Sequence, residues 1–169
     1  MNALAKTANE ALTNYASERT LVPSAIVQVT TEQKNVLNLE REIGRLPQID
    51  LPIRHFFIDS PRSVTGGYAR EMTIPQGVAL VGRVHKHPCI NIVSKGDISV
   101  TTDTGVKRIQ APCTFVSPAG TKRAGFAHEE TIWTTFHLTD ETDTEKIEDD
   151  LGTVTHQEYL EYVEKLCHS

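Results

Sequence analysis

The sequence lacks the long apolar runs and paired cysteines that mark membrane-spanning or disulfide-bonded proteins. None of its apolar runs approaches the ~20 residues that a membrane-spanning helix needs. Its three cysteines, Cys89, Cys113 and Cys167, follow no metal-motif spacing. The N-terminal stretch lacks the basic-then-apolar order of a signal peptide. We therefore expect free thiols, no membrane partner and a cytoplasmic location.

Basic residues are also scarce relative to acidic ones. The chain has 17 lysines and arginines against 22 acidic residues, for a formal net charge of -5. Because nucleic-acid-binding proteins are usually basic, we expect no nucleic-acid partner. Much of the acidity is concentrated in residues 140–150, which we interpret as a solvated helix face. P-loop, GxSxG and dinucleotide-binding motifs are missing as well.

The middle of the chain, residues 51–138, has the pattern of short β-strands. Segments rich in Val, Ile, Thr and Phe are separated by turn signals such as Pro75-Gln76-Gly77 and Lys95-Gly96-Asp97. The segment GDISVTTDTGVKRIQ is typical of a hairpin with Thr104-Gly105 in its turn. Regular short strands of this kind predict an antiparallel sandwich or barrel.

Helices are predicted on both sides of these strands. Residues 1–50 form a helical arm, with amphipathic segments over 2–16 and 30–46, and Pro47 ends the second. The arm packs either on the core or on a neighbouring subunit, and its pattern fits both. Residues 139–169 predict a short acidic helix that ends at Gly152 and a second helix with a Thr155/Glu158 capping box.

Two histidines stand one residue apart in the segment VGRVHKHPCINIVSKG, which reads as a strand. Since side chains alternate along a strand, His85 and His87 should point to the same face. Neutral imidazoles bind divalent transition metals such as Zn, Fe, Mn or Ni. A pair of this kind is also common on ordinary exposed strands, so it becomes informative only with its surroundings.

The surrounding glycines and proline make this region resemble the cupin family. The matching residues, within roughly residues 67–138, are His85, His87, Gly96, Pro118 and Gly120. The resemblance implies a mainly β fold: a cupin-type antiparallel β-barrel (jelly roll) with flanking N- and C-terminal helices. The longer stretch of sequence around these motifs also resembles small cupin-like proteins of phages and prophages. This resemblance would place the chain in a host cytoplasm or a virion. Because cupin barrels have open edges and commonly pair, we expect a homo-oligomer, a dimer foremost.

The sequence departs from the cupin pattern at two ligand positions. Where the family carries a glutamate, this chain has Asn91 or Cys89, depending on the direction of counting. Where the second motif carries a histidine, it has Lys122 and Arg123. Fixed cations repel a metal and attract an anion. We therefore predict that Asn91, Lys122 and Arg123 bind a small anionic molecule.

A later histidine can complete the metal site that the resemblance implies. His128 follows at about the spacing of the third cupin histidine, so we predict a site of His85, His87 and His128. Three ligands leave coordination positions open for a small molecule. His137 is predicted to be a structural strand residue, and Cys89 is predicted to be a small buried side chain.

Two classes of function fit these observations. The first is a small-molecule cupin, either an enzyme that uses its metal as a Lewis acid or redox centre or a binder without chemistry. The second is a non-catalytic structural or assembly protein, for example part of a phage particle, with the barrel as its scaffold. The retained His-x-His favours the first, while the altered ligand positions and the long helical arm favour the second.

Overall fold

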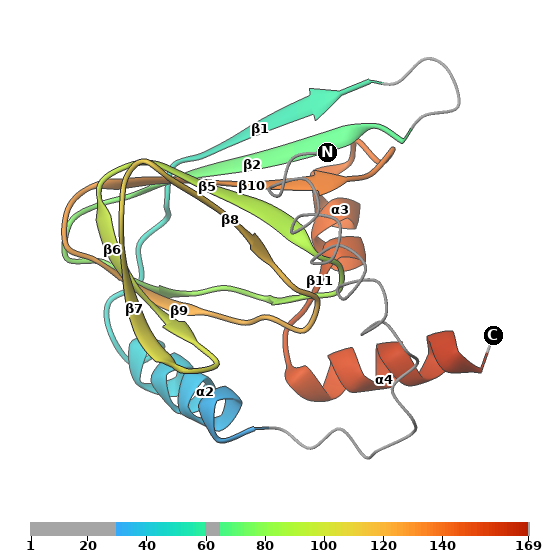
Figure 1. The fold of residues 1–169 in the computed structure, drawn as a ribbon, viewed down its shortest axis with the longest axis horizontal. Coiled ribbons are helices and arrows are strands. Elements are labelled where there is room, and N and C mark those ends of the chain that lie inside the picture. Colours follow the sequence, from blue (N-terminus) through green and yellow to red (C-terminus); the bar gives the residue numbers. More distant parts are fainter. Residues whose placement is uncertain (1–29, 60–64, 169) are drawn as a thin grey trace, which may run out of the picture.

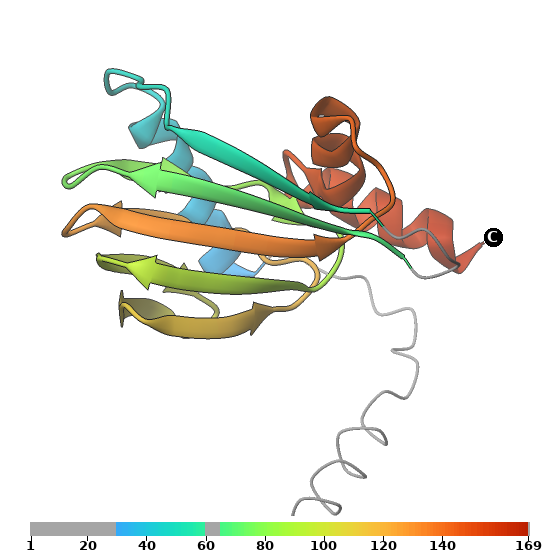
Figure 2. The same cartoon turned by 90° about the horizontal axis from the view of Figure 1, so that it is seen from above.

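The strands of the protein form two antiparallel sheets that face each other (Figure 1). The computed structural model describes residues 30–59 and 65–168. In this part of the chain, the larger sheet has the order β1-β2-β10-β5-β8 and the smaller has β3-β9-β6-β7. Figure 2 shows the larger sheet with β10 lying between β2 and β5, strands that are far from it in sequence. The predicted cupin-type jelly roll is confirmed by this arrangement.

The strands of both sheets lie within residues 51–138, where the sequence predicts them. The larger sheet contains β1 (Ile53–Ile58), β2 (Gly67–Ile74), β5 (Cys89–Lys95), β8 (Cys113–Ser117) and β10 (Thr131–Leu138). The smaller contains β3 (Ala79–Val81), β6 (Asp97–Thr102), β7 (Gly105–Gln110) and β9 (Ala124–Ala127). The short strands β4 (Val84–His85) and β11 (Gly152–Thr153) pair with each other. The predicted hairpin is confirmed as β6 and β7, where Thr102 is opposite Gly105.

Three helices flank the barrel in the described residues: α2 (Thr31–Ile43), α3 (Thr144–Leu151) and α4 (His156–Cys167). Each begins at a residue that caps free backbone N–H groups: Thr30, Asp143 and Thr155. The predicted capping box of Thr155 and Glu158 is confirmed, as is the end of α3 at Gly152. The helix predicted over residues 2–16 lies outside the described residues. None of the described helices is long and apolar enough to cross a membrane.

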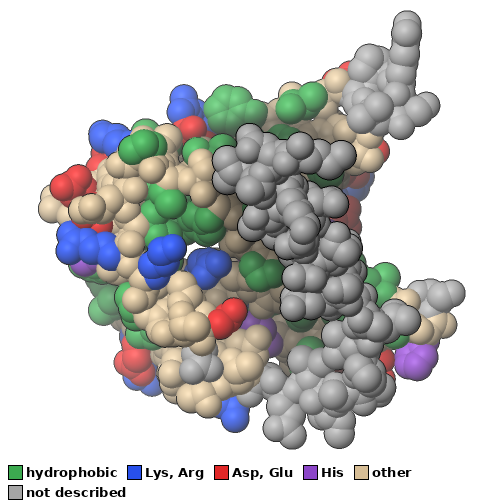
Figure 3. Space-filling model, viewed as in Figure 1, with side chains coloured by type: hydrophobic (Ala, Val, Ile, Leu, Met, Phe, Trp, Pro, Cys, Tyr) green, Lys and Arg blue, Asp and Glu red, His purple; other side chains and the backbone are tan. Residues whose placement is uncertain are grey.

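The core lies between the two sheets and forms because inward and outward side chains alternate along the strands. In β5, Cys89, Asn91 and Val93 are buried, whereas Ile90 and Ile92 are exposed. The main apolar cluster is Ile74, Val93, Ile98, Val100, Ile109, Ala127 and Trp133. On the face seen in Figure 3, apolar, basic and acidic side chains are interspersed. The predicted homo-oligomer stays a prediction.

The turn between β5 and β6 depends on Gly96, which gives a test of the barrel's packing. Its φ is +94°, and a Cβ there would lie 2.3 Å from the Glu130 carbonyl oxygen. Gly77 has a similar φ of +81°, but a Cβ there would meet nothing within 4 Å.

We expect Gly96→Ala to lower the free energy of unfolding much more than Gly77→Ala. Both changes add left-handed strain of roughly 1–2 kcal/mol, but only the first forces neighbouring backbone to move, for a total of roughly 3 kcal/mol or more. Urea-induced unfolding of the two variants measures both losses. Equal losses would show that the close approach at Gly96 is unimportant.

Candidate functional site in the barrel interior

A cavity of about 360 Å³ lies inside the barrel, at the end covered by α3. Part of its wall is apolar and comes from both sheets and from α3, including Met72, Leu80, Trp133 and Ile147. The polar part of the wall consists of Arg70, Arg83, His85, Asn91, Ser117, Arg123, Thr135, His137 and Glu148. The apolar core therefore fills the barrel only in part, and the remaining space is lined by groups that can bind and position a small molecule.

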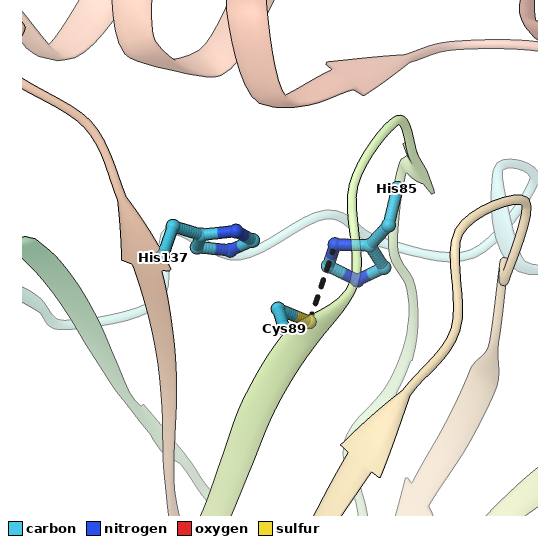
Figure 4. Close-up of side chains that lie close together, drawn as sticks. All are labelled: His85, Cys89 and His137. Atoms are coloured by element: carbon cyan, nitrogen blue, oxygen red, sulfur yellow. Dashed lines mark hydrogen bonds between the residues drawn. The ribbon is translucent and has the colours of Figure 1, made fainter. Parts of the chain in front are cut away.

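Two histidines and a cysteine form a compact group beside this cavity. The potential metal-binding atoms of His85, Cys89 and His137 all lie within 4.8 Å of one another. Cys89 Sγ is 3.7 Å from His85 Nδ1. The two imidazole rings are nearly parallel, with centroids 5.6 Å apart. Figure 4 shows the rings extending toward each other from β4 and β10, with Cys89 at the start of β5.

Backbone pairing holds each member of this group in place. The His85 N–H donates to the Thr121 carbonyl at 2.9 Å, and its carbonyl accepts from the Gly120 N–H at 2.7 Å. Cys89 is paired with Ser117 across β5 and β8. His137 follows Phe136, which is opposite Ile90, so β10 and β5 bring His137 close to Cys89. Three different strand pairings thus converge on the cluster.

The surroundings keep both imidazoles uncharged near neutral pH. Burial, followed by the charges of Arg123 and Arg70, lowers the pKa of His85. Burial lowers the pKa of His137 to about 4, with further contributions from His85, His87 and Arg70. His137 Nδ1 is buried and finds no hydrogen-bond partner among the described residues. A neutral imidazole with an unused ring nitrogen is the form that binds a metal ion.

Cys89 has the opposite requirement, because only its thiolate is a metal ligand. Burial raises the pKa of the Cys89 thiol, and a hydrogen bond from Asn91 and the charge of Arg123 offset part of this rise. The thiol is therefore protonated in the metal-free protein. A bound cation would release this proton.

Three arginines give the cavity a basic character. Arg70, Arg83 and Arg123 each have a buried Nε without a partner in the part of the chain that the structure describes. Arg123 donates through Nη1 to the Thr101 carbonyl at 3.0 Å and through Nη2 to Ser117 Oγ at 3.2 Å. Buried donors without acceptors cost roughly 1–3 kcal/mol each.

The structure does not bring His85, His87 and His128 together as one group of donors. Strand β4 ends at His85, so the alternation that would align His87 with it stops there. His87 is exposed, and its Nε2 lies 3.5 Å from the Tyr162 hydroxyl of α4. His128 lies after β9, where its Nε2 is 2.7 Å from Ser99 Oγ. Of the three histidines, only His85 joins the cluster beside the cavity.

The three predicted ligand-binding residues have different surroundings. Arg123 and Asn91 line the cavity. The Asn91 amide already accepts from Trp133 Nε1 and donates to Ser117 Oγ, both at 3.0 Å. Lys122 faces away from the cavity wall: its ammonium donates to both Glu40 carboxylate oxygens and to the Val154 carbonyl, each at 2.8 Å. Lys122 therefore connects α2 and the segment before α4 to the barrel.

Sequence reasoning did not select His137 and Cys89 as metal ligands, although each carried a signal. Cys89 is one of the two positions, with Asn91, at which the resemblance to cupins would place a ligand glutamate. His137 shares the strand face of Trp133 and Thr135, and a tryptophan on that face indicates the barrel interior. Arg70, in β2, and Arg83, between β3 and β4, were missed because a single basic residue in or beside a strand is usually exposed.

No family model and no curated protein matches the sequence. Solved structures similar to the chain include KdgF from Halomonas sp., with 17% identity over 59% of this chain and 90% of that one, and a TM-score of 0.43. A cupin superfamily protein from Desulfitobacterium hafniense has 9% identity over 58% and 87% of the two chains, with a TM-score of 0.41. An acetylacetone dioxygenase from Acinetobacter johnsonii has 16% identity over 71% and 77%, with a TM-score of 0.41.

Two glycines of the cupin motifs have the backbone conformation that the fold needs. Gly96 and Gly120 adopt φ of +94° and +80° in the turns that follow β5 and β8. The chain folds as an antiparallel β-barrel with the strand order of a jelly roll. Within this barrel, the His-x-His segment contributes one cavity-lining imidazole, that of His85.

The buried state of His137 predicts a loss of stability in mild acid. The pKa of His137 is about 4 in the folded protein against 6.5 ordinarily, so between these pH values the unfolded chain binds a proton that the folded one does not. Stability should be constant above the higher value and fall as the pH drops toward the lower one, by up to roughly 3 kcal/mol.

Unfolding free energies at about pH 7 and about pH 4.5, with a chelator present, measure this loss. His137→Gln should remove part of the difference between the two pH values, and His87→Gln, at an exposed histidine, should keep it. An unchanged pH dependence in His137→Gln would contradict the prediction.

Proposed function

We propose that the protein is a cupin-type small-molecule-binding protein that holds a divalent transition metal at His85, Cys89 and His137. We further propose that it binds a small organic anion in the adjoining cavity. One observation supports the proposal above all: the ligand atoms of two histidines and one cysteine lie close together. They do so beside a cavity that is also lined by arginines. His85, Cys89 and His137 take the place of the three histidines expected from the sequence.

The donor set suits a metal such as Zn²⁺. Typical bond lengths of about 2.0–2.3 Å and tetrahedral angles separate a sulfur and a nitrogen ligand by about 3.6 Å. Cys89 Sγ and His85 Nδ1 are 3.7 Å apart without a metal. Zinc sites that keep a position open have three protein ligands, drawn from cysteine, histidine and carboxylate side chains. A metal bound there would supply a Lewis acid to a ligand in the cavity.

Charge balance links the metal to the anion. Arg70 and Arg123 act on His85 and lower its pKa, so they also disfavour a dication nearby. The Cys89 thiolate offsets part of this repulsion, and a ligand carboxylate would offset more. We therefore infer that metal and organic anion bind cooperatively, each reducing the electrostatic cost of the other.

The cavity walls indicate the kind of anion. Apolar side chains such as Met72 and Trp133 would cover a hydrocarbon body, and Arg123 would pair with an acidic group. A volume of about 360 Å³ is at the lower end of small-molecule pockets, so the ligand is small. The alternative is a non-catalytic assembly protein of phage origin. It would use the exposed apolar side chains of the larger sheet, such as Ile90 and Val116, and need no metal.

Metal analysis tests the proposed site. Untagged protein loaded with Zn²⁺ and dialysed should retain about one equivalent. Cys89→Ser and His137→Gln should each weaken binding by roughly tenfold or more, because each removes a ligand. With Co²⁺ as the probe, the thiolate-to-metal charge-transfer band should vanish in Cys89→Ser.

Matched variants separate this site from the other cysteine and histidine positions. Cys113→Ser and His128→Gln should leave both stoichiometry and spectrum unchanged. Metal binding that survives loss of Cys89 and His137 but not loss of His128 would restore the three-histidine set. Absence of metal from the unmodified protein would favour the assembly alternative.

A further inference from the structure

The mouth of the cavity contains an acidic side chain that faces two of its arginines. Among the described residues that line the cavity, Glu148 of α3 is the one acid. Its carboxylate oxygens lie 3.7 Å from Arg70 Nε and 3.8 Å from Arg83 Nη1. These separations exceed hydrogen-bond length, and the Nε atoms of both arginines have no hydrogen-bond partner within the described part of the chain. Glu148 therefore compensates the charge of the arginines without satisfying their buried Nε donors.

We propose that Glu148 is a specificity-determining residue that occupies the place of a ligand's second acidic group and restricts the cavity to monoanions. The proposal rests on the anion-binding cavity of the proposed function and does not require the metal.

Helix α3 is held firmly enough to keep Glu148 over the cavity. Its Ile147 side chain is 1% exposed, and Arg83 pairs with Asp149 at 3.1 Å. The Lys86 N–H donates to the Leu151 carbonyl at 2.9 Å, just before β11 pairs with β4. Because the helix is anchored at both its buried face and its C-terminal end, its backbone holds Glu148 beside the cavity, within ion-pair distance of Arg70 and Arg83.

The remaining arginine, Arg123, is where the single carboxylate of a monoanionic ligand would bind. Arg123 also lines the cavity, and its guanidinium is held by the Thr101 carbonyl and Ser117 Oγ rather than by Glu148. A ligand carboxylate at Arg123 would have apolar walls around its body. A second carboxylate reaching Arg70 and Arg83 would meet Glu148, and like charges placed side by side disfavour binding. The site thus selects a small monocarboxylate with an apolar end.

Valerate and glutarate test this selection, because glutarate is valerate with its terminal methyl replaced by a carboxylate. Isothermal titration calorimetry is done on the chelator-treated full chain. The unmodified protein should bind valerate more tightly than glutarate. Glu148→Gln should strengthen glutarate binding by roughly tenfold or more and change valerate binding by less than about threefold.

Two further variants isolate the role of this carboxylate. Asp149→Asn removes a neighbouring charge of α3 that pairs with Arg83 but does not line the cavity, and it should change neither affinity by more than about threefold. Arg70→Met in the Glu148→Gln background should cancel the gain for glutarate. Circular dichroism confirms that each variant is folded, as expected for changes at partly exposed side chains.

The outcomes distinguish this inference from the proposed function. Valerate binding without a gain for glutarate in Glu148→Gln overturns the role of Glu148 and leaves the anion site intact. An equal gain in Asp149→Asn also overturns it, because the effect would then be general electrostatics. If neither acid binds to any variant, the anion site and this inference both fail, whereas the metal site is judged by metal analysis alone.

Discussion

The pairing of β4 with β11 is the interaction on which the site depends. Gly152 is opposite His85 and Thr153 is opposite Val84, so the C-terminal end of α3 is tied to the strand that carries the first histidine. The contact is close: a Cβ on Gly152 would lie 3.1 Å from Arg83 Cβ. This two-residue ladder places imidazole, guanidinium and helix at one end of the barrel. Without it, the cavity would lose the wall formed by α3.

The barrel interior combines features that stability alone would not favour. Three arginines, two uncharged imidazoles and a protonated thiol lie around one cavity, and several of their polar atoms have no partner among the described residues. By contrast, the nearby amide of Asn91 is satisfied by Trp133 and Ser117 and links β5, β8 and β10. Buried polar groups are usually paired, so the unpaired ones set this end of the barrel apart from the apolar core.

The fold could be predicted because its signals are local. The hairpin turn at Gly105, the capping box of Thr155 and the stop at Gly152 are each decided by a few neighbouring residues. The site was harder, since it depends on where strands end. Alternation predicts a shared face for His85 and His87, but β4 ends at His85, and the chain turns so that His87 contacts α4. Likewise, nothing local to Lys122 indicates that Glu40, far away in sequence, would accept its hydrogen bonds.

The Lys122 ammonium joins parts of the chain that are distant in sequence. Its side chain is 1% exposed, and its partners come from α2 on one side and from Val154 on the other. Lys122 also directly precedes Arg123, which lines the cavity. A barrel trimmed to its sheets would therefore lose every acceptor of this ammonium, one peptide bond from the guanidinium that lines the cavity. The flanking helix α2 is in this sense an electrostatic support of the cavity's surroundings, even though it contributes no side chain to the cavity wall.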